Sequence, residues 1–328
     1  VSTKGIHLSI DGKALRGAME KVKDFRAPMI LNAIDAVTGL VVAQMPIKNK
    51  DCEIKAIPEL LKLLDIHGST VTTDAIGTQT RIMDQIISRE GHFVLMVKKN
   101  QPQLYEEIVK YLEEMSEDHK RMKEEENYRP RYPEMQEKYE EIWQKERNRD
   151  RQEYRGYSVC TECSLLTKTQ KEWPLVKTVG LARQIRIPVE RDAQGNDITP
   201  DIKTFLEKGS RRRPKPVQDE ETGKDIQKTG MISDMELTAE EMGRIKREHW
   251  AVENSLHHVL DDTFREDRSP AKKSKHNLGL IRKFAYNILR IAILSGDCAE
   301  LITEAMDDFS DDHLLRKKYV FSGIDSFY

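Results

Sequence analysis

The sequence has few cysteines, no long apolar run and no large excess of charge of either sign. Its four cysteines, Cys52, Cys160, Cys163 and Cys298, provide no disulfide framework, which indicates a reduced cytoplasmic protein. No apolar run approaches the roughly 20 residues that span a bilayer. No signal-peptide pattern opens the chain. The cysteine count and the lack of a long apolar run argue against a disulfide scaffold and a membrane-spanning protein.

The charge balance excludes a globally basic protein. Lysine and arginine total 54 against 56 aspartate and glutamate, for a formal net charge of −2. Any DNA-binding surface must therefore come from local clustering of basic residues. The 328 residues suit one large domain or two modest ones, and 38% hydrophobic content supports a sizeable core. Because the chain starts at Val1 and reaches a strand within its first ten residues, we expect an N-terminal portion to be missing.

The first hundred residues have a regular alternation of strand-like and helix-like segments. Two helical patterns stand among five β-like runs, in the order β-β-β-α-β-α-β. A hairpin followed by crossover helices predicts a mixed α/β sheet of the ribonuclease H-like kind, with helices on both faces. The predicted strands are Ile6–Ile10, Met29–Ala33, Leu40–Met45, Ser69–Thr73 and His92–Val97, and the predicted helices are Cys52–Leu64 and Gln79–Glu90.

Two of these strands lead directly to an aspartate. Asp11 follows the first strand and Asp74 follows the fourth. In the ribonuclease H-like arrangement the first strand is central and the fourth lies beside it, so we expect the two aspartates to meet. Two such carboxylates and a third acid are what a two-cation phosphodiester site requires.

The middle of the chain has a different composition. Gln103–Glu153 is dense in charged residues and helical in propensity, which favours a solvated helix or helical hairpin over a binding role. Tyr157–Val159, Val176–Ile187 and Met231–Ser233 are β-like, and Arg191–Lys228 is polar enough for a mobile surface loop. We therefore expect a core with a charged helical extension over 1–156, a β-rich insertion over 157–237 and a second core part over 238–328.

The third acid, Glu253, stands on a predicted helix. Thr238 and Glu241 form a capping-box pattern at the start of that helix. One face of this helix, which we call the stripe, carries at helical spacing Trp250, Glu253, His257, Leu260 and Phe264. A carboxylate on such an apolar stripe is costly unless it is paired. The partner is either a cation shared with Asp11 and Asp74 or an arginine at the rim of the stripe.

Two other patterns offer alternative metal or redox sites. His249, Glu253 and His257 stand four residues apart on the helix, as zinc ligands can, but without the HExxH pattern, and hydrogen-bonding histidines are the competing interpretation. Cys160 and Cys163 form a lone CxxC, which favours unpaired cysteines.

Basic residues cluster around the proposed third acid. The segment from Arg244 to Lys283 contains ten lysines and arginines and six acidic residues, and Lys98–Gln101 follows the last predicted strand of the sheet. Such patches fit phosphate contacts, although solvated charge explains any single residue equally well.

Several sequence blocks together resemble the H-repeat-associated group of DDE transposases from bacterial insertion sequences. They occur in the family's order over about residues 5–290. The blocks are Ile10–Gly17, Glu53–Leu61, Thr73–Gln79, Lys98–Pro102, Arg247–Asp267 and Asn277–Arg290.

The resemblance implies a catalytic triad of Asp11, Asp74 and Glu253 that holds two Mg²⁺ ions, with Mn²⁺ as a substitute. It implies DNA strand cleavage and strand transfer at insertion-sequence ends, in the bacterial cytoplasm at the nucleoid, with a homodimer acting on double-stranded DNA. Trp250 either packs in the core or stacks an unpaired base. The candidate DNA contacts are Lys13, Arg16, Lys99, Arg247 and Trp250.

The chain departs from the family pattern at three points. We expect the family's small N-terminal helical domain to be missing, Arg149–Arg155 stands where the family has a His-Gly-Arg-x-Glu stretch, and the loop Arg191–Lys228 is long. Two alternatives therefore stay open: a decayed or domesticated transposase that binds DNA without catalysis, and a zinc hydrolase built on His249, Glu253 and His257.

Overall fold

The chain folds into two compact units. The computed structural model describes residues 3–15, 29–48, 52–147, 150–202, 204–205, 226–269 and 274–321. The first unit comprises Val1–His92 and Lys246–Tyr328, and the second comprises Phe93–Ile245. The predicted boundaries after residues 156 and 237 therefore differ from the boundaries of these units, which fall after residues 92 and 245.

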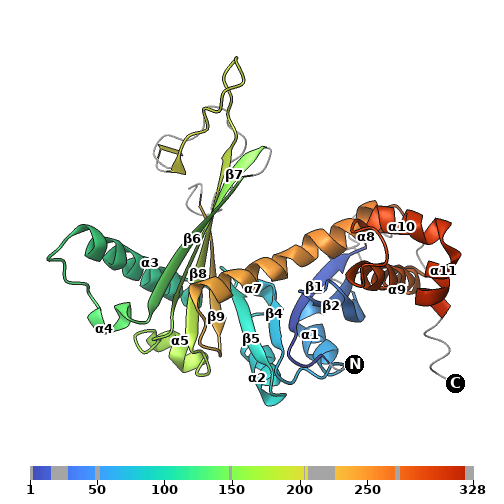
Figure 1. The fold of residues 1–328 in the computed structure, drawn as a ribbon. Helices are drawn as coiled ribbons and strands as arrows, with labels where there is room; N and C mark the ends of the chain where they lie inside the picture. The colour runs from blue at the N-terminus through green and yellow to red at the C-terminus, as the bar shows by residue number, and fades with distance from the viewer. Residues whose placement is uncertain are drawn as a thin grey trace, which may run out of the picture. The chain divides into compact units, whose positions relative to one another are not determined.

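The first unit contains a mixed sheet in the order β3-β2-β1-β4 (Figure 1). The central strand β1 pairs antiparallel with β2 and parallel with β4. All the strands and both helices predicted for this stretch occur, so the α/β prediction is confirmed. The strands are β1 His7–Ala14, β2 Met29–Asp35, β3 Val41–Ile47 and β4 Thr70–Thr73, and the helices are α1 Glu53–Leu61 and α2 Thr80–Ser88.

The turn between β2 and β3 explains the predicted hairpin. The Gly39 amide donates to the Asp35 carbonyl over 2.7 Å, and the Asp35 carboxylate accepts from the Val37 amide and the Thr38 hydroxyl. Gly39 has a φ of +77°, a conformation that glycine adopts without a steric penalty. The predicted turn at Asp35–Gly39 is therefore confirmed, with Gly39 in the conformation that the turn requires.

A long helical segment leads from the second unit into the first. It begins as predicted with a capping box, in which the Thr238 amide donates to Glu241 over 2.9 Å and the Glu241 amide donates to Thr238 Oγ1 over 3.2 Å. The segment consists of α7 Ala239–Val252, the π-helical turn η4 Glu253–His257 and α8 His258–Asp262, and is followed by η5 Glu266–Arg268, α9 Lys275–Leu294, α10 Ile302–Asp311, α11 His313–Arg316 and η6 Lys317–Phe321.

The π-helical turn changes which residues face the core. Val252, Leu256 and Leu260 are buried and pack with Ile34 and Tyr286. The predicted stripe was therefore wrong at its start, because Trp250 is 45% exposed and Glu253 is also exposed. In a π turn the backbone hydrogen bonds span five residues instead of four. The buried residues are therefore spaced four apart here, whereas on one face of a regular helix the spacing alternates between three and four residues.

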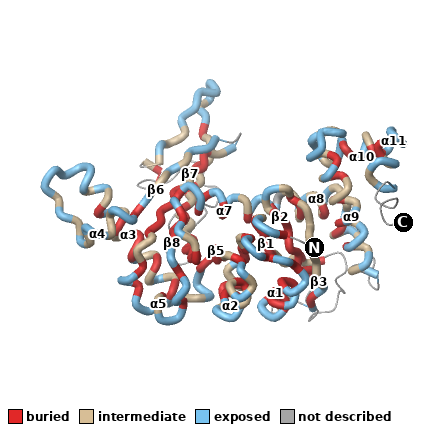
Figure 2. Tube along the Cα trace, turned by 60° about the horizontal axis from the view of Figure 1, so that its bottom comes forward, coloured by how far each residue is buried: buried red, intermediate tan, exposed pale blue. Residues whose placement is uncertain are grey.

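The second unit is built on an antiparallel sheet in the order β5-β9-β8-β7-β6. Met242 and Ile245 of α7 pack on its core with Tyr157 and Val159. Four of its strands, β5, β7, β8 and β9, are largely buried, whereas β6 and the outer sides of its helices are largely exposed (Figure 2). The strands are β5 His92–Val97, β6 Tyr139–Arg147, β7 Arg151–Cys160, β8 Thr178–Pro188 and β9 Gln227–Ser233, and the helices are α3 Pro102–Glu124, α4 Pro133–Gln136 and α5 Thr167–Glu172.

The helical prediction for Gln103–Glu153 was wrong in its second half. The chain forms a β6–β7 hairpin there, with Trp143 paired to Gly156. Most of the charged side chains of β6 are exposed or half-exposed, which gives the strand the composition of a solvated helix. The predicted loop Arg191–Lys228 lies partly outside the described residues, which omit 206–225, and β9 begins at Gln227.

The cysteines and helices of the structure bear on two further expectations. All four cysteines are free thiols, and Cys160 and Cys163 are buried. In the described ranges, no helix combines the length and apolarity needed to cross a membrane.

Candidate functional site

The strand register brings Asp11 and Asp74 together. Parallel pairing of β1 with β4 runs from His7 opposite Thr70 to Ile10 opposite Thr73. Asp11 and Asp74 are the next residues on the two strands, whose backbones run about 4.8 Å apart. Asp74 also stands at the N-cap of the short helix η3, Ala75–Gly77. Asp74 therefore lies just past the carboxyl end of β4, and Asp11 lies within β1 at the point where its pairing with β4 ends, so the strand predicted to end at Ile10 continues to Ala14.

The helical segment from Lys246 to Asp262 follows β1 through a series of polar contacts. Alternate residues of β1 point to one face of the sheet, and each meets a residue of the helix in the same order along both elements. This arrangement holds the helix against the sheet, with Glu253 between the second and third contacts. The contacting pairs are His7–Glu248, Ser9–His249, Asp11–His257 and Lys13–Asp261.

The two histidines of this helix contact different aspartates. His249 is buried, with Nδ1 at 2.8 Å from both Ser9 Oγ and Thr72 Oγ1 and Nε2 at 3.6 Å from Asp74 Oδ1. His257 Nδ1 lies 3.4 Å from Asp11 Oδ2. Burial, followed by the charges of Lys13 and Lys283, lowers the pKa of His257 to about 4, so its imidazole is neutral at pH 7. Each histidine is thus placed to orient one carboxylate.

Asp11 lies in the most electrostatically unfavourable position of the site. Burial, followed by the charge of Asp74 and then those of Glu53 and Glu253, raises the pKa of Asp11 to about 7, while a hydrogen bond from the Gly12 amide to Asp11 Oδ1 opposes the increase. All three other acids therefore lie close enough to act on Asp11 through their charge. The exposed Glu253 belongs to this acidic cluster although it does not lie on the buried face of its helix.

Glu53 and Asn32 belong to the same surroundings but did not stand out in the sequence. Glu53 is 5% exposed at the start of α1, and a Cβ added to Gly12 would lie 2.1 Å from its Oε1. Asn32 is opposite Asp11 in the β1–β2 register, fully buried, and its Oδ1 has no hydrogen-bond partner. The glycine after Asp11 was the available signal, since it permits the close approach of Glu53.

Metal binding requires rearrangement of these side chains. Within the described ranges, no three His, Cys, Asp or Glu side chains are already arranged to hold one metal ion. This applies to the zinc set of His249, Glu253 and His257 as well as to the three acids. The raised pKa of Asp11 nevertheless shows that its negative charge lacks a compensating positive charge. The buried Oδ1 of Asn32 likewise lacks a hydrogen-bond donor.

The structure separates the candidate DNA contacts into different environments. Lys13 is 4% exposed and pairs with Asp261 and with Glu266, whose Oε2 lies 3.3 Å from Lys13 Nζ, so its position does not support a phosphate contact. Arg247 and Trp250 are exposed on α7, so Trp250 does not pack in the core. Lys99 is exposed in the turn after β5, in the second unit, and Arg16 lies outside the described residues.

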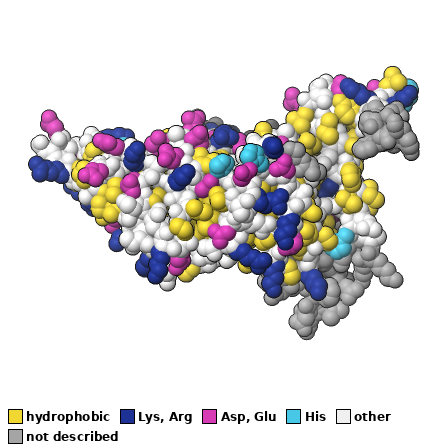
Figure 3. Space-filling model, turned by 90° about the horizontal axis from the view of Figure 1, so that it is seen from below, with side chains coloured by type: hydrophobic (Ala, Val, Ile, Leu, Met, Phe, Trp, Pro, Cys, Tyr) yellow, Lys and Arg dark blue, Asp and Glu magenta, His cyan; other side chains and the backbone are white. Residues whose placement is uncertain are grey.

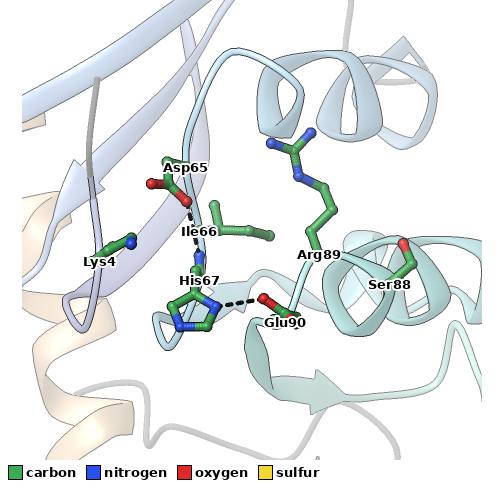
Figure 4. Close-up of a pocket in the computed structure, with 7 residues that line it drawn as sticks. All are labelled: Lys4, Asp65, Ile66, His67, Ser88, Arg89 and Glu90. Atoms are coloured by element: carbon green, nitrogen blue, oxygen red, sulfur yellow. Dashed lines mark hydrogen bonds and ion pairs between the residues drawn. The ribbon is translucent and has the colours of Figure 1, made fainter.

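A surface hollow of about 530 Å³ lies elsewhere in the first unit (Figure 4). Lys4 precedes β1 and Asp65–His67 precede β4, so the hollow is at the amino ends of these two strands, away from Asp11 and Asp74. Two contacts join its lining residues: His67 Nδ1 lies 2.7 Å from Glu90, and the His67 amide donates to the Asp65 carboxylate. We assign no function to it.

Basic and acidic side chains are interspersed on the surface. The face in Figure 3 shows lysines and arginines among aspartates and glutamates, as the near-zero net charge predicts. Local arrangement, and not total charge, must therefore produce any affinity for DNA.

Known proteins similar to this chain include several from Escherichia coli. Strain K12 has YbfL, 29% identical over 287 residues, and the H repeat-associated protein YhhI, named as a candidate transposase and 28% identical over 287 residues. Each alignment covers 86% of this chain and 63% of the relative. YncI of strain O157:H7, also named as a candidate transposase, is 27% identical over 302 residues, or 91% of this chain and 64% of the relative. The chain thus spans just under two thirds of the length of these relatives.

A solved structure and a family profile complete the comparison. The structure is the piggyBac transposase synaptic complex with hairpin DNA, with a TM-score of 0.47 and 12% identity over 98% of this chain and 54% of that one. The family profile is described as a transposase DDE domain and matches residues 2–288. The profile match and the H repeat-associated relatives confirm the resemblance noted in the sequence: the chain belongs to the transposase DDE domain family.

Proposed function

We propose that the chain is the catalytic, ribonuclease H-like part of a DDE transposase that cleaves and transfers DNA strands at insertion-sequence ends. Asp11, Asp74 and Glu253 are the proposed metal ligands. The supporting observation is the position of Asp11, which shares the end of a parallel strand pair with Asp74 and has its pKa raised by burial and by three neighbouring acids. A buried carboxylate whose charge is destabilised by three neighbouring acids favours a bound cation.

The donor set fits a hard divalent cation. Carboxylate and amide oxygens are the ligands of Mg²⁺, and Asn32 adds a buried amide oxygen that lacks a partner. We expect Asp74 and Glu253 to reach the cations by side-chain rotation, since both are exposed. Two bound ions would supply an activated water or 3′-hydroxyl and stabilise the leaving oxygen.

The chain's own residues prepare the acids for this role. The Gly12 amide fixes one oxygen of Asp11, and the neutral His257 lies at the other oxygen. His249, held by Ser9 and Thr72, lies beside Asp74. We infer that these contacts orient the two aspartates before a cation binds. On the exposed surface of α7, Arg247 is a proposed phosphate contact and Trp250 a proposed stacking surface for an unpaired base.

The biological setting is part of the proposal. Double-stranded DNA, as transposon ends and target, is the proposed substrate, and a homodimer on DNA is the proposed assembly. The site of action would be the bacterial cytoplasm at the nucleoid.

The direct test is cleavage of DNA that carries the element's ends, with Mg²⁺ or Mn²⁺. Asp11→Asn should abolish cleavage while preserving the fold, because it removes the charge that binds the cation. Asp84→Asn, an exposed aspartate on α2, is the matched control and should cleave like the wild type. Unchanged cleavage by Asp11→Asn refutes the assignment. Metal-independent DNA binding without cleavage by the wild type would support the decayed transposase, and stoichiometric zinc without a response to Mg²⁺ would support the zinc hydrolase.

A further inference from the structure

The second unit contains three arginines arranged around one buried glutamate. Glu153 of β7 is 1% exposed, with Oε1 at 2.6 Å from Arg151 Nε and 3.3 Å from Arg186 Nε. Arg155 contacts the other carboxylate oxygen, Oε2. Arg186 of β8 is directly opposite Glu153 in the strand register, and Arg155 is two residues along β7. We call Arg151, Arg155 and Arg186 the arginine cluster.

In the described ion pairs, the arginines of the cluster outnumber the acids that contact them. Besides Glu153, the only acid that contacts it among the described ion pairs is Glu146, through Arg155. Within these ion pairs, three guanidinium groups contact two carboxylates. Each guanidinium has five donors and each carboxylate about four acceptor positions, so donors outnumber acceptors by roughly two to one.

The arginines also reach the surface. Their side chains are 42%, 20% and 24% exposed for Arg151, Arg155 and Arg186. One arginine would suffice to pair a buried glutamate, so the burial of Glu153 does not explain three. The buried carboxylate instead keeps three partly exposed guanidiniums beside one another on one face of the sheet, through ion pairs in which Arg151 Nε and Glu153 Oε1 form no hydrogen bond.

A row of polar side chains extends the cluster across the sheet. Gln144, Arg155, Gln184 and Gln227 are in register on β6, β7, β8 and β9 and share one face. All four are half-buried. Four neighbouring strands span about 14 Å at roughly 4.8 Å each. Duplex DNA carries one phosphate charge per about 1.7 Å of its axis, so several phosphates fit along such a row.

We propose that the arginine cluster binds phosphates of the DNA backbone, at a site separate from the acids of the first unit. Arginine forks match phosphate oxygens with two parallel hydrogen bonds. The choice of DNA over another polyanion rests on the proposed function.

The test measures binding of a labelled mixed-sequence DNA duplex to the full chain in EDTA, so that no step depends on metal or cleavage. The double variant Arg151→Gln with Arg186→Gln leaves Arg155 paired with Glu153. Its control is Arg121→Gln with Arg129→Gln, which removes the same charge from α3 and the loop that follows it. We expect the cluster variant to bind DNA at least about tenfold more weakly and to reduce the salt slope of log affinity by roughly two, since two phosphate contacts are lost.

Several results would overturn the proposal. Equal affinity of the two double variants, or no DNA binding by the wild type, refutes it. Binding of polyglutamate is measured in the same way. If the cluster variant loses binding to polyglutamate but keeps the wild-type affinity for DNA, the ligand is instead an acidic protein segment. Equal melting temperatures exclude misfolding, and where the double variant melts earlier, Arg151→Gln alone is compared with Arg121→Gln alone. Failure of the catalytic proposal would appear only in the cleavage assay.

Discussion

Asp11 combines the most unusual electrostatics of the site with a fixed position in the sheet. Its neighbours are acids, a neutral imidazole and one backbone amide. In the absence of a cation, its ionisation therefore opposes folding. This property makes the residue testable without any knowledge of the DNA sequence.

The pH dependence of stability should report on Asp11. A carboxyl with a folded pKa of about 7 and an ordinary value of 3.8 binds more protons when folded, so the stability it contributes falls as the pH rises from about 4 to about 7. Asp11→Asn removes this loss. In EDTA, we expect the variant to be no more stable than the wild type below pH 4 but more stable at pH 8, by at most about 4 kcal/mol.

Urea denaturation across this pH range measures the difference. The pKa of His257 is lowered, so this residue makes stability rise as the pH increases from about 4 to about 6.5. Because both proteins contain His257, its contribution cancels to first order in their stability difference. A constant difference over the whole range would show that Asp11 titrates normally.

Gly12 should resist substitution because of Glu53. A Cβ at position 12 would lie 2.1 Å from Glu53 Oε1, so Gly12→Ala must displace a buried carboxylate. We expect a loss of roughly 1–3 kcal/mol in the free energy of unfolding. In the background Glu53→Ala the same change should cost much less, and a double-mutant cycle by chemical denaturation gives the coupling. Additive effects would contradict the predicted clash.

At the scale of elements, the long helix from Ala239 positions Glu253 and both histidines. Its capping box satisfies backbone donors at the first turn. Thr238→Ala should cost about 1 kcal/mol of stability, because an alanine side chain cannot accept the hydrogen bond from the Glu241 amide. Thermal or urea unfolding measures this cost. Thr238→Ser, which keeps the hydroxyl, should stay close to the wild type, and equal losses in the two variants would argue against capping.

The strand pairing and the helix caps were predictable because they follow from local chemistry. The β-like runs before Asp11 and Asp74, the Asp35–Gly39 turn and the Thr238–Glu241 box each carry their signal in adjacent residues. The β6 strand was not predictable from composition, since Tyr139–Arg147 has charged side chains on its solvent face. The π turn at Glu253–His257 also has no local signature, so the predicted stripe began on the wrong residues.

The site was predictable in part for the same reason. The neighbourhood of Asp11 and Asp74 follows from the order of strands, but the contacts of His249 and His257 depend on how the helix lies on the sheet. Glu53 was missed because a glutamate in the first turn of a helix is ordinary. The metal-binding role of Asp11, Asp74 and Glu253 stays a prediction.

At the scale of the molecule, the proposed functions are divided between the two units. The acids lie in the first unit, and the arginine cluster lies in the second. The chain carries almost no net charge, so both binding of cations and binding of DNA must come from local groups. The two activities should accordingly be separable by substitution.

The most direct test of the central claim is anomalous diffraction from crystals soaked with Mn²⁺. We predict a Mn²⁺ peak at coordination distance, about 2.2 Å, from the Asp11 carboxylate, with Asp74 or Glu253 as a second ligand. Crystals of Asp11→Asn should lose this peak. A Mn²⁺ peak bound by His249 and His257 without the aspartates, or no peak at Asp11 in the wild type, would contradict the account.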